Sequence, residues 1–145
     1  MTKAVVRLMG LVLDASVTIA RVYAEQSTPA VRMAFETVAA QVAWVPELWH
    51  LEVANVLEVG VRRGRHGHDF LENTLADLAL LSIQVDPETS RHAWGATARL
   101  AARHKLTLYD AAYLELALRR KLPLATLDKN LRTAASAESV QLLGI

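Results

Sequence analysis

The chain contains no cysteine, no long hydrophobic run and no marked excess of charge of either sign. The absence of cysteine excludes disulfides, thiolate zinc sites and a cysteine nucleophile. No apolar run approaches the roughly 20 residues that cross a membrane. The apolar run near the N-terminus is short and ends at Asp14 without a small-residue cleavage site, so we expect a strand there and no signal peptide. These absences favour a cytoplasmic protein without a membrane anchor.

What the chain does have is enough apolar material for one folded domain. It has 145 residues, of which 52% are hydrophobic, so disorder is not expected and residues 1–145 are expected to form a single domain. The 16 basic and 15 acidic residues give a formal charge of +1, which neither requires nor excludes nucleic acid. If several acids gather in one pocket, the remaining surface is more basic than this total suggests.

Short apolar segments alternate with helical patterns along the chain. The apolar segments predict strands over 8–13, 43–45, 82–85, 124–127 and 140–143. The patterns between them predict helices over 17–25, from Pro29, over 47–62, around 71–78, from Pro87 through 101, from Asp110, and over 129–135. This alternation predicts an α/β fold in which a parallel sheet of about five strands is flanked by helices on both faces.

Four carboxylates recur at positions that should be hydrophobic or tightly turned: Asp14, Glu52, Asp110 and Asp128. Asp14 and Asp128 follow predicted strands directly, and ligands of open parallel sheets bind at the carboxyl ends of strands. A carboxylate in an apolar setting is costly unless something pairs with it, and a divalent cation would pair with several at once. The pattern therefore favours a metal-dependent enzyme.

Each carboxylate also has a structural interpretation that leaves this hypothesis open. Glu52 falls in an apolar sector of its predicted helix but could be a surface acid, and nearby Asn55 could bond either a carboxylate or the backbone. Asp110 and Asp128 are both candidate N-caps, and a cap leaves one oxygen free for a metal. Asp14 could form a local turn with Ser16.

Four short motifs occur in a fixed order between about residues 11 and 143. They are Asp14-Ala15-Ser16, Glu52-Val53-Ala54-Asn55, Tyr109-Asp110-Ala111-Ala112-Tyr113 and Ala125-Thr126-Leu127-Asp128. In order, spacing and context they resemble the signatures of PIN-domain proteins, and the chain's size resembles that of VapC-type toxins. The stretch before Leu11 is longer than in such toxins, so residues 1–8 are expected to be an N-terminal extension, with Met9 as an alternative start.

The resemblance implies a Mg²⁺- or Mn²⁺-dependent endoribonuclease that acts as the toxin of a toxin–antitoxin pair. By motif match, the catalytic and metal-binding quartet would be Asp14, Glu52, Asp110 and Asp128, with Ser16, Thr126 and Asn55 supporting it. It also implies a homodimer and a small cognate antitoxin lying across the early helices. Four apolar residues there could line a groove as easily as the core: Ile19, Val22, Val31 and Phe35.

Phosphates reach an acidic pocket only if basic groups hold them. Candidate RNA-binding residues are Arg62, Arg63 and Arg65, ahead of Arg99, Arg103, Arg119 and Arg120. The last two are expected to point outward with Glu115, on the side of their helix away from the core. The three tryptophans, Trp44, Trp49 and Trp94, are at positions typical of core packing.

Two other functions fit parts of the pattern. A phosphatase or phosphotransfer domain would use Asp14 as its nucleophile, but Ser16 stands where a dehalogenase-like phosphatase needs a second aspartate. Lys129 follows Asp128 too closely for the lysine of a receiver domain. A non-catalytic RNA- or protein-binding module is the other alternative, although such a module has no reason to keep four costly carboxylates.

Overall fold

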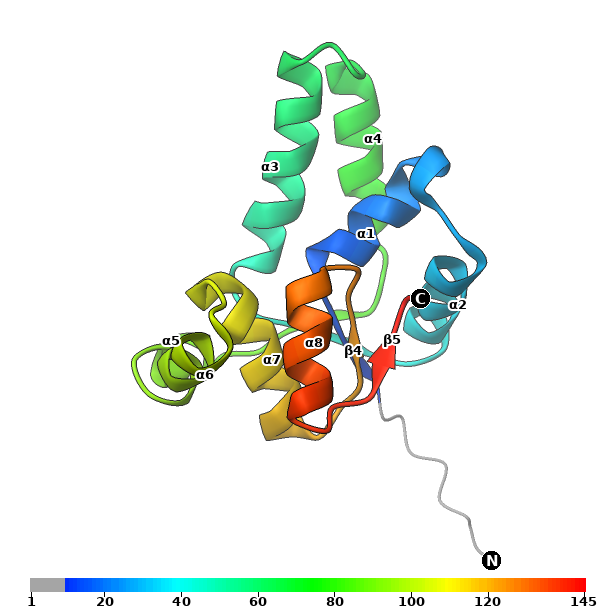
Figure 1. The fold of residues 1–145 in the computed structure, drawn as a ribbon. Helices are drawn as coiled ribbons and strands as arrows, with labels where there is room; N and C mark the ends of the chain where they lie inside the picture. The colour runs from blue at the N-terminus through cyan, green and yellow to red at the C-terminus, as the bar shows by residue number, and fades with distance from the viewer. Residues whose placement is uncertain (1–9) are drawn as a thin grey trace, which may run out of the picture.

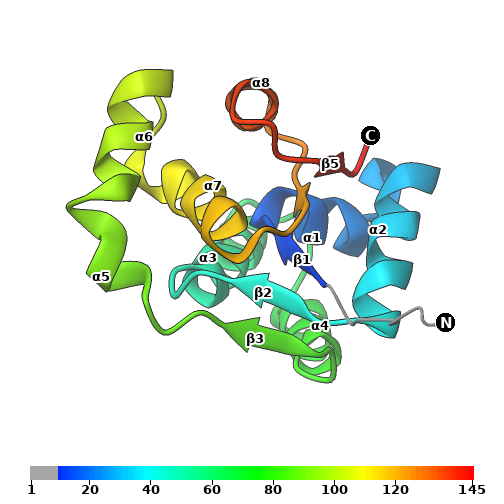
Figure 2. The ribbon, with the colours of Figure 1, turned by 90° about the horizontal axis from the view of Figure 1, so that it is seen from below.

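Five short strands form one parallel sheet in the order β3-β2-β1-β4-β5 (Figures 1 and 2). The structure is a computed structural model that describes residues 10–145. The predicted extension over residues 1–8 and the alternative start at Met9 lie outside the described residues. The strands are β1 (Leu11–Leu13), β2 (Ala43–Val45), β3 (Ile83–Val85), β4 (Leu124–Ala125) and β5 (Leu142–Leu143), which confirms the predicted parallel sheet.

Helices connect the strands and flank the sheet, as predicted (Figure 1). The helices α3 and α4 form a hairpin that rises beyond the sheet, whereas α5 and α6 lie against α7 at the other side. None of the helices in residues 10–145 combines the length and apolar character needed to cross a bilayer. The helices are α1 (Ala15–Val22), the 3-10 turn η1 (Ala24–Gln26), α2 (Pro29–Ala40), α3 (Trp49–Arg62), α4 (His68–Leu78), α5 (Thr89–Ala93), α6 (Ala96–His104), α7 (Leu108–Arg120) and α8 (Lys129–Ala137).

The strand order reverses between β1 and β4. The chain starts in the middle of the sheet at β1, adds β2 and β3 on one side, and then returns to add β4 and β5 on the other. Leu13 of β1 pairs with Ala125 of β4, so the residues that follow these two strands emerge side by side. In open parallel sheets this reversal point is where ligands bind. The fold therefore brings the residues after Leu13 and after Ala125 to one edge.

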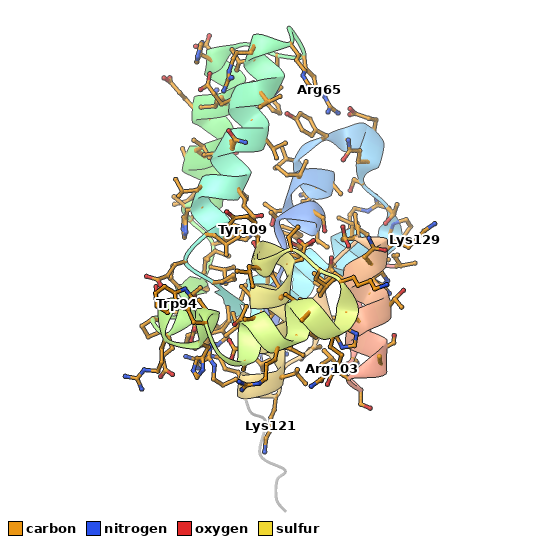
Figure 3. All side chains as sticks on the ribbon, turned by 60° about the vertical axis from the view of Figure 1, so that its left-hand side comes forward. Arg65, Trp94, Arg103, Tyr109, Lys121 and Lys129 are labelled. Carbon is orange, nitrogen blue, oxygen red and sulfur yellow. The ribbon has the colours of Figure 1, made fainter. Side chains whose placement is uncertain are left out.

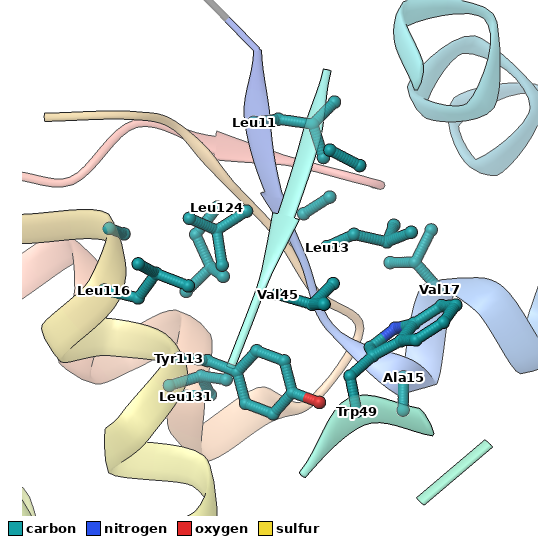
Figure 4. Close-up of a cluster of buried hydrophobic side chains, with 14 of the residues drawn as sticks. Leu11, Leu13, Ala15, Val17, Val45, Trp49, Tyr113, Leu116, Leu124 and Leu131 are labelled. Carbon is teal, nitrogen blue, oxygen red and sulfur yellow. The ribbon is translucent and has the colours of Figure 1, made fainter. Parts of the chain in front are cut away.

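The core is built around β1, whose three residues are fully buried. Side chains of the neighbouring strands and of α1, α3, α7 and α8 surround it, as Figure 4 shows for Val17, Trp49, Tyr113 and Leu131. Fully burying a side chain of this size contributes about 1.5–3 kcal/mol. This packing fixes the two strand ends that carry the candidate site.

The helix predicted from Pro87 through 101 is interrupted, which corrects the prediction for one tryptophan. Helix α5 ends at Ala93 and α6 begins after Gly95, whose backbone is not helical. The break changes the helical phase, so Trp94 is 96% exposed instead of packed, whereas Thr97 on α6 is buried. Of the other two tryptophans, Trp49 is buried in the core and Trp44 is partly buried.

Two further helix predictions need correction. The helix predicted over 17–25 starts two residues earlier and ends at Val22, with η1 after it. On α3 the buried residues are Trp49, Val53, Leu57 and Gly60, whereas Val56 is 39% exposed. Glu52, predicted inside an apolar sector, instead lies at the margin of the buried face as a half-buried residue.

The outward orientation predicted for Glu115, Arg119 and Arg120 is wrong. Asp86, at the end of β3, is fully buried and accepts a forked pair of hydrogen bonds from Arg119, at 3.0 and 2.7 Å. Arg120 donates to the same carboxylate at 3.0 Å and stacks 3.6 Å from the centre of the Trp44 ring. Glu115 is only 5% exposed and accepts from Arg119 Nε at 2.7 Å. A buried carboxylate thus draws both guanidinium groups inward.

Candidate active site

Asp14 follows β1 directly and occupies the N-cap position of α1 without capping it through its side chain. Its Oδ2 atom accepts two hydrogen bonds of 2.7 Å, from the hydroxyls of Ser16 and Thr126. Asp14 is only 5% exposed. Because both hydroxyls use Oδ2, the Oδ1 atom has no side-chain partner among residues 10–145. The hydrogen bond with Ser16, which forms the predicted local turn, is therefore compatible with a role for Asp14 in a site at the end of β1.

The two hydroxyls also shape the loop after β4. Ser16 Oγ accepts from the backbone N–H of Leu127 at 2.9 Å, and Thr126 Oγ1 accepts from that of Asp128 at 3.1 Å. Each hydroxyl thus accepts from the β4 loop while donating to Asp14. These bonds join the ends of β1 and β4 and fix Asp128 relative to Asp14.

Asp128 is the N-cap of α8, as the structural interpretation predicted. Its Oδ1 atom accepts from the backbone N–H of Leu131 at 2.8 Å. No described residue bonds its Oδ2 atom, so the cap leaves one carboxylate oxygen available. Capping and a role in the site are compatible here.

Asp110 is not a cap, which corrects the predicted start of its helix. Helix α7 begins at Leu108, and Thr107 is its N-cap, with Oγ1 accepting from the backbone N–H of Asp110 at 3.1 Å. Asp110 therefore lies in the first turn of α7, half-buried. Because the cap is supplied by Thr107, capping does not account for the carboxylate at this position.

Glu52 is held by Tyr113, the last residue of the third motif. The hydroxyl of Tyr113, a fully buried residue of α7, donates a 2.5 Å hydrogen bond to Oε1 of Glu52 on α3. The partners are 61 residues apart in sequence. The recurrence of Tyr113 one turn after Asp110 was the available signal, since both residues lie on the same side of α7.

The four carboxylates share one electrostatic environment. Burial raises the pKa of Asp14 above its ordinary value, and the charge of Asp128 raises it further, against the hydrogen bonds from the two hydroxyls. Burial likewise raises the pKa of Glu52, with contributions from Asp14 and Asp110. The pKa of Asp110 is raised by burial and then by the charges of Asp128 and Asp14. Each carboxylate is therefore close enough to others in the quartet to feel their charge.

The chemistry of this donor set fits a hard divalent cation. Among residues 10–145, no lysine or arginine forms an ion pair with any of the four carboxylates. In that range, no three acidic or histidine side chains lie close enough together to hold a metal ion without other ligands. Mg²⁺ does not require such a cage, because it takes one or two carboxylates and keeps several waters. The quartet fits that looser mode of binding.

The remaining predicted site residues lie elsewhere. Asn55 is exposed and bonds none of the carboxylates, whereas Arg62 and Arg63 are exposed at the far end of α3. Arg65, labelled at the tip of the α3–α4 hairpin in Figure 3, pairs with Glu25 and lies 3.5 Å from the centre of the Tyr23 ring. Ten residues of helix separate Glu52 from Arg62, about 15 Å along the axis. The structure does not bring these residues to the carboxylates.

The sequence matches one protein family over most of its length. The PIN domain family matches residues 11–137, a range that contains all four carboxylates. No curated protein matches the chain.

Solved structures share the fold at low sequence identity. PAE2754 from Pyrobaculum aerophilum is 23% identical, with a TM-score of 0.61 over 88% of this chain and 80% of that one. A toxin–antitoxin complex from Klebsiella pneumoniae is 20% identical, with a TM-score of 0.56 over 82% and 87%. VapC20 of Mycobacterium tuberculosis, a sarcin–ricin loop cleaving toxin, is 17% identical, with a TM-score of 0.58 over 86% and 95%. From the family match and the fold together, the chain belongs to the PIN domain family.

Proposed function

We propose that this protein is a metal-dependent endoribonuclease of the VapC type, the toxin of a toxin–antitoxin pair. The observation that carries the proposal is the arrangement of carboxylate oxygens at the strand reversal. Asp14, Glu52 and Asp128 each have one oxygen bonded to the protein, and their other oxygen has no side-chain partner among residues 10–145. Two of the similar structures are described as a toxin–antitoxin complex and a sarcin–ricin loop cleaving toxin, which supports this kind of activity.

Each residue of the quartet has a distinct task in this proposal. Asp14 and Asp110 would hold Mg²⁺ or Mn²⁺ directly. Glu52 and Asp128 would orient the attacking water through the oxygens that Tyr113 and the α8 backbone leave open. Ser16 and Thr126 hold Asp14 in place by donating to its Oδ2 atom. When bound, such an ion neutralises phosphate charge, lowers the pKa of water and stabilises the leaving oxygen.

A groove on the early helices suits the proposed antitoxin. It has a volume of about 330 Å³ between α1, α2 and α4. Its apolar lining consists of Val22, Phe35, Phe70, Leu78 and Leu81, and Arg21, Thr74 and Asp77 add polar groups. Of the four residues predicted for core or groove, Val22 and Phe35 line it, whereas Val31 is fully buried. An apolar groove of this kind accepts the apolar side of an amphipathic segment.

A homodimer and a cytoplasmic location complete the proposal. Light scattering of the purified protein tests whether it is a dimer.

The decisive experiment measures cleavage of a structured RNA by purified protein with Mn²⁺ and with a chelator. Asp14→Asn and Asp110→Asn should abolish metal-dependent cutting, whereas Glu72→Gln, which removes an exposed carboxylate on α4, should leave it intact. Equal cutting by all variants would identify a contaminating nuclease. No cutting together with no metal binding would contradict the proposal, and the non-catalytic binding module would then be the better hypothesis.

A further inference from the structure

An exposed tyrosine and an exposed lysine flank the carboxylate quartet. Tyr109 immediately precedes Asp110 in the first turn of α7 and is 65% exposed. Lys129 immediately follows Asp128 at the start of α8 and is also exposed. Asp110 is close enough to Asp128 for the Asp128 charge to act on it. The two side chains are therefore anchored next to neighbouring carboxylates of one site.

Figure 3 places both residues at the N-terminal ends of their helices. In Figure 3, Tyr109 and Lys129 lie at the level where α7 and α8 begin, and Lys121 marks the opposite end of α7. No described residue forms a hydrogen bond with the Tyr109 hydroxyl or an ion pair with the Lys129 ammonium. Leu108, beside Tyr109, is also partly exposed, so the first turn of α7 presents an apolar surface to solvent.

The charge of the quartet makes such a surface useful to an RNA-cutting enzyme. Four carboxylates repel the phosphates of an approaching strand, and the arginines expected to offset this lie at the far end of α3. Base stacking on an aromatic ring supplies affinity that this repulsion does not weaken, because the base is uncharged. A cation beside Asp128 would then hold a phosphate of the same strand.

We propose that Tyr109 and Lys129 form a nucleotide clamp, in which Tyr109 stacks on an unpaired base and Lys129 binds a phosphate of the same single-stranded RNA. This rests on the nuclease function proposed above and deepens it by assigning substrate-binding residues. Only an unpaired base fits, because a base within a duplex already stacks on its neighbours and exposes no face. Neither side chain takes part in the hydrolysis.

The chain contains a matched control for each residue. Trp94 is another exposed aromatic residue, on the turn between α5 and α6, next to none of the carboxylates. Lys121 is an exposed lysine at the far end of α7. Trp94→Ala tests whether any exposed ring supports binding, and Lys121→Gln tests whether any exposed cation does.

The experiment measures the Kd of an unstructured oligoribonucleotide by fluorescence anisotropy, with every variant made in an Asp14→Asn background to prevent cutting. The oligonucleotide has about 8 nucleotides, within the site sizes of single-strand-binding domains. Tyr109→Ala should weaken binding about tenfold, and Tyr109→Phe, which keeps the ring, should not. Lys129→Gln should reduce the slope of log K against log salt by about 0.7, the value of one phosphate contact on a single strand. Trp94→Ala and Lys121→Gln should behave like the background.

An unchanged Kd in Tyr109→Ala, or an equal loss in Trp94→Ala, would overturn the clamp. A parallel cleavage assay, with Asp14 intact and Mn²⁺ present, separates this failure from failure of the proposed function. If the protein cuts RNA but Tyr109→Ala does not change the Kd, the nuclease proposal stands and the clamp is wrong. Tyr109-dependent binding without cutting would leave the clamp and remove the nuclease. If Tyr109→Ala weakened binding to a partner protein and left the Kd for RNA unchanged, the ring would belong to a protein interface and the clamp would be overturned.

Discussion

The hydroxyl of Tyr113 donates a 2.5 Å hydrogen bond to Oε1 of Glu52 and so joins α7 to α3 inside the candidate site. Tyr113 is fully buried, and its bond is the one side-chain hydrogen bond that Glu52 makes among residues 10–145. The bond also lowers the pKa of Glu52 against the larger effect of burial. Tyr113 thereby holds a half-buried carboxylate in a defined position beside Asp14 and Asp110.

Tyr113→Phe should therefore destabilise the protein without changing its fold. The variant removes a bond to a charged acceptor, which costs about 1–3 kcal/mol. Urea unfolding measures this as a lower midpoint with an unchanged slope. Tyr109→Phe is the control, because its hydroxyl is at the surface, and it should stay within about 0.5 kcal/mol of wild type. An equal loss in both variants would show that the bond to Glu52 contributes nothing.

Asp14→Asn should stabilise the metal-free protein at neutral pH. Burial raises the pKa of Asp14 in the folded state, so the ionised carboxylate opposes folding. Asparagine keeps an oxygen for the Ser16 and Thr126 hydroxyls and carries no charge, and the expected gain is about 0.5–2 kcal/mol.

The pH dependence of this gain has a defined sign. A group whose folded pKa is raised binds more protons in the folded state, so its favourable contribution is fully present below the unfolded pKa and is lost as pH rises through the folded pKa. The advantage of Asp14→Asn should therefore disappear below about pH 3.9, the ordinary pKa of aspartate, where Asp14 is protonated in both states. Chemical unfolding in chelator at several pH values measures it. A gain independent of pH would contradict the electrostatic cause.

Metal binding should reverse the order of stability between wild type and Asp14→Asn. At a concentration of about 100 Kd, an ion that binds only the folded state adds about 2.7 kcal/mol. For a domain of this size that is a rise of about 8 °C in Tm. Wild type and Glu72→Gln should show the rise with Mn²⁺, and Asp14→Asn and Asp110→Asn should not. The rise should shrink at acid pH, because protons compete for carboxylates whose pKa values are raised. An equal rise in all four proteins would indicate a different metal site.

The edge of the sheet that carries Asp14 and Asp128 was predictable because it depends on local pattern and on a general rule of topology, although β4 ends at Ala125, two residues before the predicted end. Asp14 and Asp128 each follow an apolar segment, and parallel strands bring such residues to one edge. The hydroxyls of Ser16 and Thr126, which belong to the first and fourth motifs, both donate to Asp14. The N-cap at Thr28, marked by the following Pro29, was also predictable, and its hydroxyl accepts from the backbone N–H of Val31 at 3.1 Å.

The features that escaped prediction depend on partners far away in sequence. Periodicity predicted Arg119 on the outer side of α7, but its guanidinium group turns inward to donate to Asp86, which lies 33 residues earlier. The third motif likewise contains Tyr113 without indicating that its hydroxyl donates to Glu52. The exposure of Trp94 follows from the backbone at Gly95, which ends one helical phase and begins another. Sequence periodicity predicts which side of a helix is buried, but not which distant polar group that side contacts.

Asp86→Asn should be among the more destabilising single substitutions at neutral pH. Asp86 is fully buried and is bonded by Arg119 and Arg120, so it fixes the last turn of α7 against the end of β3. Removing its charge leaves both guanidinium groups without this carboxylate and should cost about 3 kcal/mol. This is toward the low end for a buried ion pair, because the arginines remain partly exposed.

The effect should also depend on pH. Burial alone would raise the pKa of Asp86, but the arginine hydrogen bonds outweigh it and hold the pKa low. The contribution is therefore present above the unfolded pKa and is lost as pH falls through the folded one, opposite in sign to that of Asp14. Urea unfolding at neutral and acid pH measures it, with Glu25→Gln, which breaks the exposed pair with Arg65, as a control that should leave the midpoint unchanged. A loss in Asp86→Asn that is as large at acid pH as at neutral pH would mean that packing, and not charge, holds α7 in place.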